Sequence, residues 1–548
     1  MARWRRAALA IGGLDIRNAN LSWDDASQGQ RFEVSRLSVQ TGAIATGEPV
    51  DLAVALDVAL GEPAISGHIA AEGRVDYDQA RKRARVQGFE IDGEFSGAQL
   101  PGGKTRVSLA ADVEHDGASQ SLLVENLRVA AADLELAGEL RVSDLGKSPT
   151  TKGSVRIEEF NPKKLLAALS VQTPETADPK ALTRASLEAT LGGGPNQLSV
   201  KPLTLRLDDS TLTGEVAVAD FKSQALRFDL AMNAIDVDRY LPPEKKQAKG
   251  AEPATPGTAA AGAAEVPKEA LRRLDVAGRV KIAKLKAAKL NLTEVEMSVK
   301  AKDGLIRLKP IGARLYDGTY RGDITVDARG ELLRTRVDEN LEGVQAGPLL
   351  KDLQGQDRIT GTGNVSIAMR ATGATPDEVK KSLNGVTKFA FTDGAINGVN
   401  IPRMIRDAHA RIKGIKLPPE EAEQKTDFSE LRGTMRVEKG VATNDDFIVM
   451  TPLMRINGKG TANIVTETVD YRVRATVVKT LKGQGGEGLE DLAGIPIPIH
   501  VTGTFAEPSY ALDTEALAEA VAKSKVQEVI EKKVGDDAVK GLLKGLIK

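Results

Sequence analysis

Hydrophobic and polar residues alternate along most of the chain with a period of two. In the stretch VDLAVALDVAL, residues 50–60, apolar side chains occupy every second position: Leu52, Val54, Leu56, Val58 and Leu60. Successive side chains of an extended strand point to opposite faces, so these residues lie on one face of a predicted strand. The alternation runs from residue 14 to about residue 240 and resumes after residue 270. The pattern therefore predicts a mainly β protein.

A short unit recurs within these strands and reads apolar-x-Gly-x-apolar-x-apolar. Its copies are centred on five glycines: Gly138, Gly214, Gly278, Gly322 and Gly433. The spacing between copies is uneven, which argues against a solenoid of fixed period. We interpret each glycine as a bend or bulge within one large antiparallel sheet. A glycine on the apolar face also leaves room for another group to lie against the backbone.

Helical patterns are few. A helix is predicted at 161–169, where Asn161 and Pro162 provide a start signal, and short helical segments are predicted at 236–243 and 375–383. The amphipathic segments 401–414 and 513–548 are also predicted to be helical. Both could lie on a membrane, but we expect them to cover an open end of the sheet.

Changes in composition suggest a division of the chain. Residues 244–268 are rich in Ala, Gly and Pro, which predicts a flexible linker or loop. Because the strand pattern resumes unchanged after it, we expect this segment to loop out from one continuous sheet. The expected parts are a ragged start (1–13), an N-terminal β part (14–243), the linker (244–268), a C-terminal β part (269–512) and a C-terminal amphipathic helix (513–548).

Composition narrows the possible functions. The chain has 548 residues, of which 41% are hydrophobic but only 3% aromatic, so its apolar face is aliphatic. Its 75 Lys and Arg nearly balance its 76 Asp and Glu, which gives no reason to expect a nucleic acid partner. The chain contains no cysteine, and this excludes disulfides, thiolate metal sites and cysteine catalysis.

No pattern of catalytic or metal-binding residues stands out. The histidines, at positions 68, 115, 409 and 500, are isolated, and we expect each on the surface or on an edge strand. The pairs Asp208-Asp209 and Asp236-x-Asp238 are explained by turns and helix starts. The glycine-rich run 483–488 lacks the Lys-Ser/Thr of a phosphate-binding loop. We therefore predict no enzyme activity, no cofactor and no metal.

The apolar face needs a cover, and the predicted helices are too few to supply it. Two alternatives follow: a second sheet packs against it, or the sheet curls into an elongated groove whose lining contacts a greasy ligand. Nine residues are the candidate lining: Leu52, Val54, Leu56, Val58, Leu136, Leu140, Leu212, Val216 and Val218. The periodicity alone favours the packed alternative.

A family resemblance favours the groove. The segments NANLSWDDASQGQRF, EEFNPKKLLAALSVQTPETADPKAL, LRLDDSTLTGEVAV and AIDVDRYLPP resemble, in this order, the AsmA family of Gram-negative envelope proteins. GVTKFAFTDGAINGVNIPRMIRDA and IPIPIHVTGTFAEPSYALD resemble its C-terminal region. The resemblance implies a periplasmic body anchored in the inner membrane and a role in outer-membrane biogenesis. Such proteins resemble bridge-like lipid-transfer proteins, whose β-elements form a long groove for acyl chains.

The resemblance sets the expected function and partners. We expect a long, twisted antiparallel sheet, curled into an apolar groove, that binds or conducts phospholipid acyl chains between the inner and outer membranes. The alternative is an assembly factor that acts on outer-membrane proteins through protein contacts, without lipid. No stretch reaches the ~20 apolar residues of a membrane span. The family's N-terminal anchor and first strands have no counterpart here, so we expect a truncated reading frame or a fragment, and inner-membrane association is implied by the resemblance alone.

Overall fold

The computed structural model describes residues 10–25, 30–45, 47–61, 64–98, 100, 103–169, 171–243, 268–414, 423–478 and 492–513, together with 515, 518–519 and 522–523. The chain forms two compact units. Unit 1 comprises residues 1–246 and 275–287, and unit 2 comprises 247–274 and 288–548. Most of the predicted linker, nearly all of the predicted C-terminal helix and the run 483–488 lie outside the described residues.

Unit 1 contains one sheet whose strands pair in chain order. The strands are β2 (Asp15–Asp25), β3 (Gln30–Thr41), β5 (Val50–Leu60), β6 (Ile65–Asp78), β7 (Arg83–Gly97), β8 (Lys104–Asp116), β9 (Ser121–Ala131), β10 (Leu134–Ser143), β11 (Thr150–Phe160), β12 (Ala185–Gly194), β13 (Gln197–Leu207), β14 (Ser210–Asp220), β15 (Ala225–Asp236) and β16 (Val276–Ala287). Two short strands, β1 (Ala10–Ile11) and β4 (Ile44–Ala45), pair separately. The helical segments are α1 (Pro162–Ala168) and the 3₁₀ turn η2 (Val237–Arg239).

One strand pair of unit 1 departs from the predicted antiparallel arrangement. Neighbours from β2 to β15 are antiparallel, but β16 pairs with β15 in parallel, with Leu226 opposite Val276 and Met232 opposite Ile282. Parallel neighbours need a long crossover connection, and here the segment between β15 and β16 provides the length. The chain therefore returns to the same sheet after this segment.

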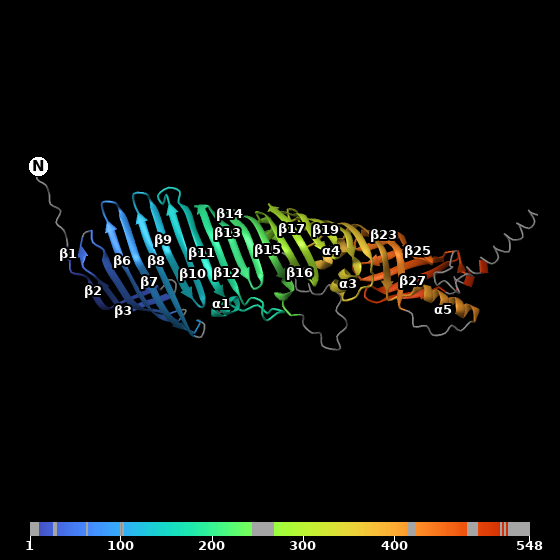
Figure 1. Ribbon diagram of the computed structural model, residues 1–548, viewed down its shortest axis with the longest axis horizontal. Helices are drawn as coiled ribbons and strands as arrows, with labels where there is room; N and C mark the ends of the chain where they lie inside the picture. Colours follow the sequence, from blue (N-terminus) through green and yellow to red (C-terminus); the bar gives the residue numbers. More distant parts are fainter. Residues whose placement is uncertain are drawn as a thin grey trace, which may run out of the picture. The chain divides into compact units, whose positions relative to one another are not determined.

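Unit 2 contains a second run of strands in chain order, all paired antiparallel. They are β17 (Leu290–Lys302), β18 (Leu305–Leu315), β19 (Gly318–Asp327), β20 (Arg334–Gln345), β21 (Thr362–Thr372), β22 (Asn384–Asn397), β23 (Lys425–Glu438), β24 (Val441–Met450), β25 (Met454–Asn463), β26 (Thr468–Val477), β27 (Pro496–Thr504) and β28 (Pro508–Leu512). Its helices are α2 (Lys268–Arg272), α3 (Ala346–Gln354), α4 (Pro376–Ser382) and α5 (Ile401–Lys413). The predicted fold class is confirmed: the chain is mainly β, its strands form curled sheet, and the described helices are few and short (Figure 1).

The short helices begin where local side chains satisfy their first N–H groups. In α1, the Asn161 side chain accepts a hydrogen bond from the Lys164 amide at 3.0 Å, and proline occupies the first turn. In α4, Thr375 and Glu378 form a reciprocal capping box. Both starts are those predicted from the sequence.

The five recurring glycines make close approaches of two kinds. A side chain at Gly278 would collide with the Phe228 ring, one at Gly322 with the Tyr320 phenol, and one at Gly433 with the Phe389 ring. Gly138 and Gly214 instead lie against backbone carbonyls of the adjacent strand. The room predicted above these glycines is thus filled by the protein's own rings and backbone.

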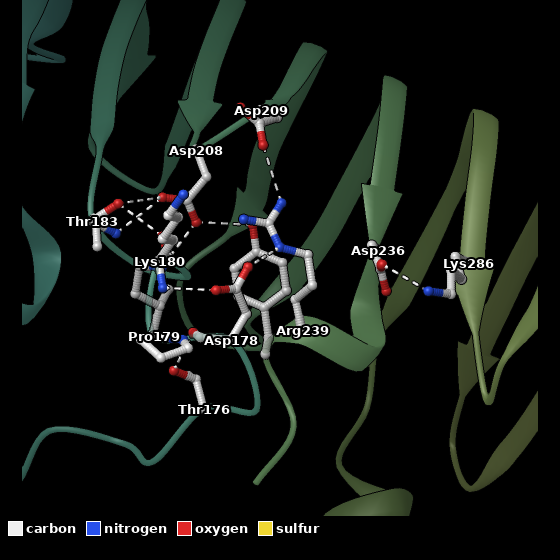
Figure 2. Close-up of polar contacts among 12 residues, drawn as sticks. Thr176, Asp178, Pro179, Lys180, Thr183, Asp208, Asp209, Asp236, Arg239 and Lys286 are labelled. Atoms are coloured by element: carbon white, nitrogen blue, oxygen red, sulfur yellow. Dashed lines mark hydrogen bonds and ion pairs between the residues drawn. The ribbon is translucent and has the colours of Figure 1, made fainter. Parts of the chain in front are cut away.

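Three of the sequence segments that carry the family resemblance meet at one end of the unit 1 strands (Figure 2). Asp208, in the turn between β13 and β14, accepts hydrogen bonds from the amides of Leu182 (2.8 Å), Thr183 (2.9 Å) and Arg184 (3.1 Å). The Tyr240 hydroxyl donates to the same carboxylate at 3.0 Å. These contacts join the segment before β12 to the residues after η2, so Asp208 has the turn role expected for it.

Arg239 of η2 extends this polar cluster (Figure 2). Its guanidinium donates to Asp178 at 2.7 Å and to Asp209 at 3.1 Å. Nearby, Lys286 of β16 donates to Asp236 of β15 at 3.2 Å.

Among the described residues, no group of three or more histidines and carboxylates is arranged to hold a metal ion.

Candidate functional site

Unit 1 carries one unbroken apolar face. Residues directly opposite each other in a sheet share a face, and one row of such partners crosses every strand from β2 to β16. Its members are all aliphatic side chains or methionine: Ile16, Val39, Val54, Ala71, Ile91, Leu109, Val129, Leu136, Ile157, Leu187, Leu205, Leu212, Met232 and Ile282. We call the face that contains this row the unit 1 apolar face.

The structure places all nine predicted lining residues on the unit 1 apolar face. Leu52, Val54, Leu56 and Val58 alternate along β5, Leu136 and Leu140 along β10, and Leu212, Val216 and Val218 along β14. The row of cross-strand partners links Val54, Leu136 and Leu212 directly. All nine side chains are half-buried. That they contact a ligand stays a prediction.

β-Bulges keep the apolar side chains in register across strands of unequal length. Opposite Gly138 and Leu140 of β10, strand β9 presents Leu127 and Val124, with an extra residue between them. Asn126, inside this bulge, has a left-handed backbone with φ 52°. A one-residue slip without the bulge would turn the rest of β9 to the other face.

The opposite face of unit 1 is polar and bears ion pairs between neighbouring strands. Asp51 accepts from Arg74 at 2.7 Å, and Glu114 accepts from Arg85 at 2.6 Å. The hydrogen bond from Arg74 holds the pKa of Asp51 below its ordinary value. The Asp51 and Arg74 side chains are exposed and those of Arg85 and Glu114 are in part exposed, so this face is suited to water and the apolar face is the one that needs a cover.

Within the described residues of unit 1, the apolar face has little cover. Several large side chains of this face are exposed on β2 and β3: Leu21 is 62%, Trp23 68% and Phe32 39% exposed. Phe32 pairs with Trp23 on one side and with Leu60 on the other, so these residues belong to the same face. An aliphatic face left this open is unusual for a protein surface and indicates a binding surface.

Unit 2 differs from unit 1 in the cover of its apolar face, because the C-terminal part of this face is buried under other residues of the chain. Ile405 of α5 is fully buried and packs with sheet residues such as Met454 and Ile456, which are 0% and 1% exposed. Leu492 and Ile495 complete this cluster. Helix α5 thus covers part of the sheet; that residues 401–414 close an open end of it stays a prediction.

The histidines lie apart from one another, and for one of them the predicted surface or edge-strand position is wrong. His68 and His500 are partly exposed, each 2.7 Å from an aspartate, Asp57 and Asp470 respectively. His115 is exposed. His409, expected on the surface or on an edge strand, instead lies in helix α5 and is only 6% exposed, because α5 is packed against the sheet.

Glu339 is not among the residues predicted from the sequence to form a site. Cross-strand pairing places this glutamate on the apolar face of unit 2, opposite Gly322 on one side and Ile367 on the other. The available signal was the alternation in β20, where Val337, Glu339 and Leu341 share a face. A charge at such a position is a departure from the pattern of this face.

Comparison with known proteins supports the resemblance. A sequence model of the AsmA family matches residues 3–447. The chain is 24% identical to Protein AsmA of Escherichia coli (strain K12) over 350 residues, which cover 61% of this chain and 55% of that protein. The aligned part thus spans little more than half the length of this relative. None of the described helices has the length and apolar character needed to cross a membrane.

Proposed function

Because the chain belongs to the AsmA family, we propose that it binds phospholipid acyl chains on the unit 1 apolar face and conducts them between the inner and outer membranes. Family membership and the large open β-sheet fit an envelope protein. In this proposal the protein is not an enzyme, acts in the periplasm in association with the inner membrane, and supports outer-membrane biogenesis. The observation that carries the proposal is the aliphatic row from Ile16 to Ile282.

The chemistry of this row suits acyl chains. Hydrocarbon tails need apolar area and no directional hydrogen bonds, and burying each methylene stabilises the complex by about 0.8 kcal/mol. Aliphatic side chains on a sheet offer a continuous surface on which a tail can move without breaking specific contacts. The polar opposite face, with ion pairs such as Asp51–Arg74, would remain in water.

Two substitutions on the apolar face test lipid binding. The full chain would be incubated with vesicles of phosphatidylethanolamine and phosphatidylglycerol and repurified, and its bound lipid counted by mass spectrometry. Leu56→Asp and Val216→Asp are expected to lower bound lipid several-fold, since a carboxylate in the path must be desolvated when a tail covers it.

Adjacent residues supply matched controls. Ala55→Asp and Ala217→Asp place the same charge on the opposite face of the same strands, and bound lipid should stay unchanged. Circular dichroism would show that each variant keeps its strands. Wild-type protein that acquires no lipid would contradict the proposal. A stable complex with an outer-membrane protein, also without lipid, would instead support the alternative of an assembly factor.

A further inference from the structure

Glu339 is an isolated charge in the middle of the unit 2 apolar face. Its own cross-strand row consists of Ile311, Gly322, Glu339, Ile367, Thr387 and Met435. The flanking rows are Leu308, Ile324, Val337, Met369, Gly385 and Val437 on one side, and Ala313, Tyr320, Leu341, Val365, Phe389 and Gly433 on the other. Glu339 is the only charged residue in these three rows.

The surroundings of Glu339 form a small polar site within this apolar face. The Tyr320 phenol lies over Gly322, the residue opposite Glu339, and the missing side chain of Gly322 makes this position possible. Burial, together with the charge and hydrogen bond of the Glu339 carboxylate, raises the pKa of Tyr320 to about 12. The phenol therefore stays protonated at physiological pH, and its O–H donates a hydrogen bond to the Glu339 carboxylate.

Glu339 has room for further donors. The carboxylate is half-buried, and within the part of the chain that the structure describes it forms no salt bridge. The nearby arginines of the polar face have their own partners: Arg336 donates to Asp338 at 2.7 Å, and Arg321 lies 3.7 Å from Glu342. A carboxylate has about four acceptor sites, and the phenol fills one. An unpaired charge among apolar neighbours is costly, so a cationic donor would be bound favourably.

We propose that Glu339 and Tyr320 bind the primary ammonium group of a phospholipid headgroup whose acyl chains lie on the unit 2 apolar face. The inference rests on the proposed lipid binding and adds headgroup selectivity to it. A primary ammonium carries a positive charge and three N–H donors, which match the remaining acceptors of the carboxylate. A quaternary ammonium has the charge but no N–H, and an anionic headgroup without an amine has neither.

The test compares headgroups that differ in this one property. The full chain would be incubated with vesicles of equimolar phosphatidylethanolamine and phosphatidylcholine with matched acyl chains, then repurified, and the two lipids counted by mass spectrometry. Wild-type protein is expected to enrich phosphatidylethanolamine about tenfold over the vesicle ratio, the size of one charge-assisted hydrogen bond. Glu339→Gln should abolish the enrichment, and Tyr320→Phe should reduce it.

The controls separate this inference from the proposed function. Glu342→Gln removes a carboxylate from the polar face of the same strand and should leave the enrichment unchanged. Total lipid per protein should stay within about twofold in all variants, because acyl chains supply most of the affinity. Wild-type protein that binds lipid at the vesicle ratio, or Glu339→Gln protein that keeps the enrichment, would overturn the inference alone. Wild-type protein without bound lipid would overturn the proposed function.

Discussion

Replacing Asp208 is expected to loosen one end of the unit 1 sheet. Its carboxylate accepts three backbone N–H groups, from Leu182, Thr183 and Arg184, at 2.8–3.1 Å, and the Tyr240 hydroxyl at 3.0 Å. Asp208→Ala leaves these donors without their acceptor. Hydrogen bonds to a charged group contribute about 1.5–3 kcal/mol each, and water can replace part of this at a half-buried site. We expect a net loss of about 3 kcal/mol of local stability.

The neighbouring aspartate provides a matched control. Asp209 is 70% exposed and, among the described residues, accepts only from the Arg184 and Arg239 side chains, each at 3.1 Å. Exposed ion pairs of this kind contribute about 0–1 kcal/mol. Asp209→Ala is therefore expected to cost less than about 1 kcal/mol, although it removes the same chemical group one residue away.

The contribution of Asp208 should also depend on pH. Burial works to raise the pKa of Asp208, but the N–H groups of Thr183, Leu182 and Arg184 outweigh it and hold the pKa below the ordinary value of 3.8. A carboxyl group whose pKa is lower in the folded state than in the unfolded state stabilises the fold at pH values above its unfolded-state pKa. This stabilisation is lost as the pH falls through the folded-state pKa. The difference between wild type and Asp208→Asn should therefore be largest near neutral pH and shrink below about pH 3.8.

Hydrogen exchange of the full chain, read by mass spectrometry, measures this effect locally. In Asp208→Ala, peptides that cover 180–186 should exchange about a hundredfold faster, which corresponds to about 3 kcal/mol. In Asp209→Ala the increase should stay below about fivefold. Equal acceleration in both variants, or none in Asp208→Ala, would refute the assignment of Asp208 as the residue that joins these segments.

Further substitutions test the packing of each unit. Ile456 is 1% exposed in the sealed core of unit 2, and Ile456→Ala should lower the free energy of unfolding, measured in urea, by about 2–5 kcal/mol. Leu212 is half-buried, and Leu212→Ala should lower it by less than half as much. Equal losses would mean that the unit 1 apolar face is packed as tightly as a core. Gly278→Ala should destabilise unit 1 by about 1–3 kcal/mol because its methyl group meets the Phe228 ring. In a Phe228→Ala background this penalty should largely disappear, and a penalty of the same size there would rule out the ring as its cause.

Alternation of apolar and polar residues predicted the faces of the sheet well. Leu52 to Val58 and Leu212 to Val218 share a face because the period of a strand is two, and this needs no knowledge of the partner strands. The start of α1 at Asn161 and Pro162 was predictable for a similar reason, since a cap is a local interaction. Strand periodicity and helix capping both depend only on residues that are close in sequence, so both can be predicted without the fold.

Features that depend on pairing between distant residues could not be predicted in the same way. The parallel pairing of β15 with β16 joins segments that are separated in sequence, and alternation is the same in parallel and antiparallel strands. The buried position of His409 depends on where α5 packs, which its own helical pattern does not specify. The position of Glu339 on an apolar face follows only from the register of β20 against β19 and β21, which the sequence of β20 does not specify.

The contrast between the two units shows why alternation leaves the function open. Strand β5 in unit 1 and strand β25 in unit 2 both alternate, yet Val54 and Leu56 are half-buried, whereas Met454 and Ile456 are sealed under residues such as Ile405. The difference comes from what covers the face, and the cover is supplied by residues outside the strand. A face that is aliphatic and open can hold hydrocarbon from another molecule, while a chemically similar face under a helix stabilises the fold. Lipid bound by wild type and lost in Val216→Asp, but kept in Ala217→Asp, would show that the unit 1 apolar face takes its cover from a ligand.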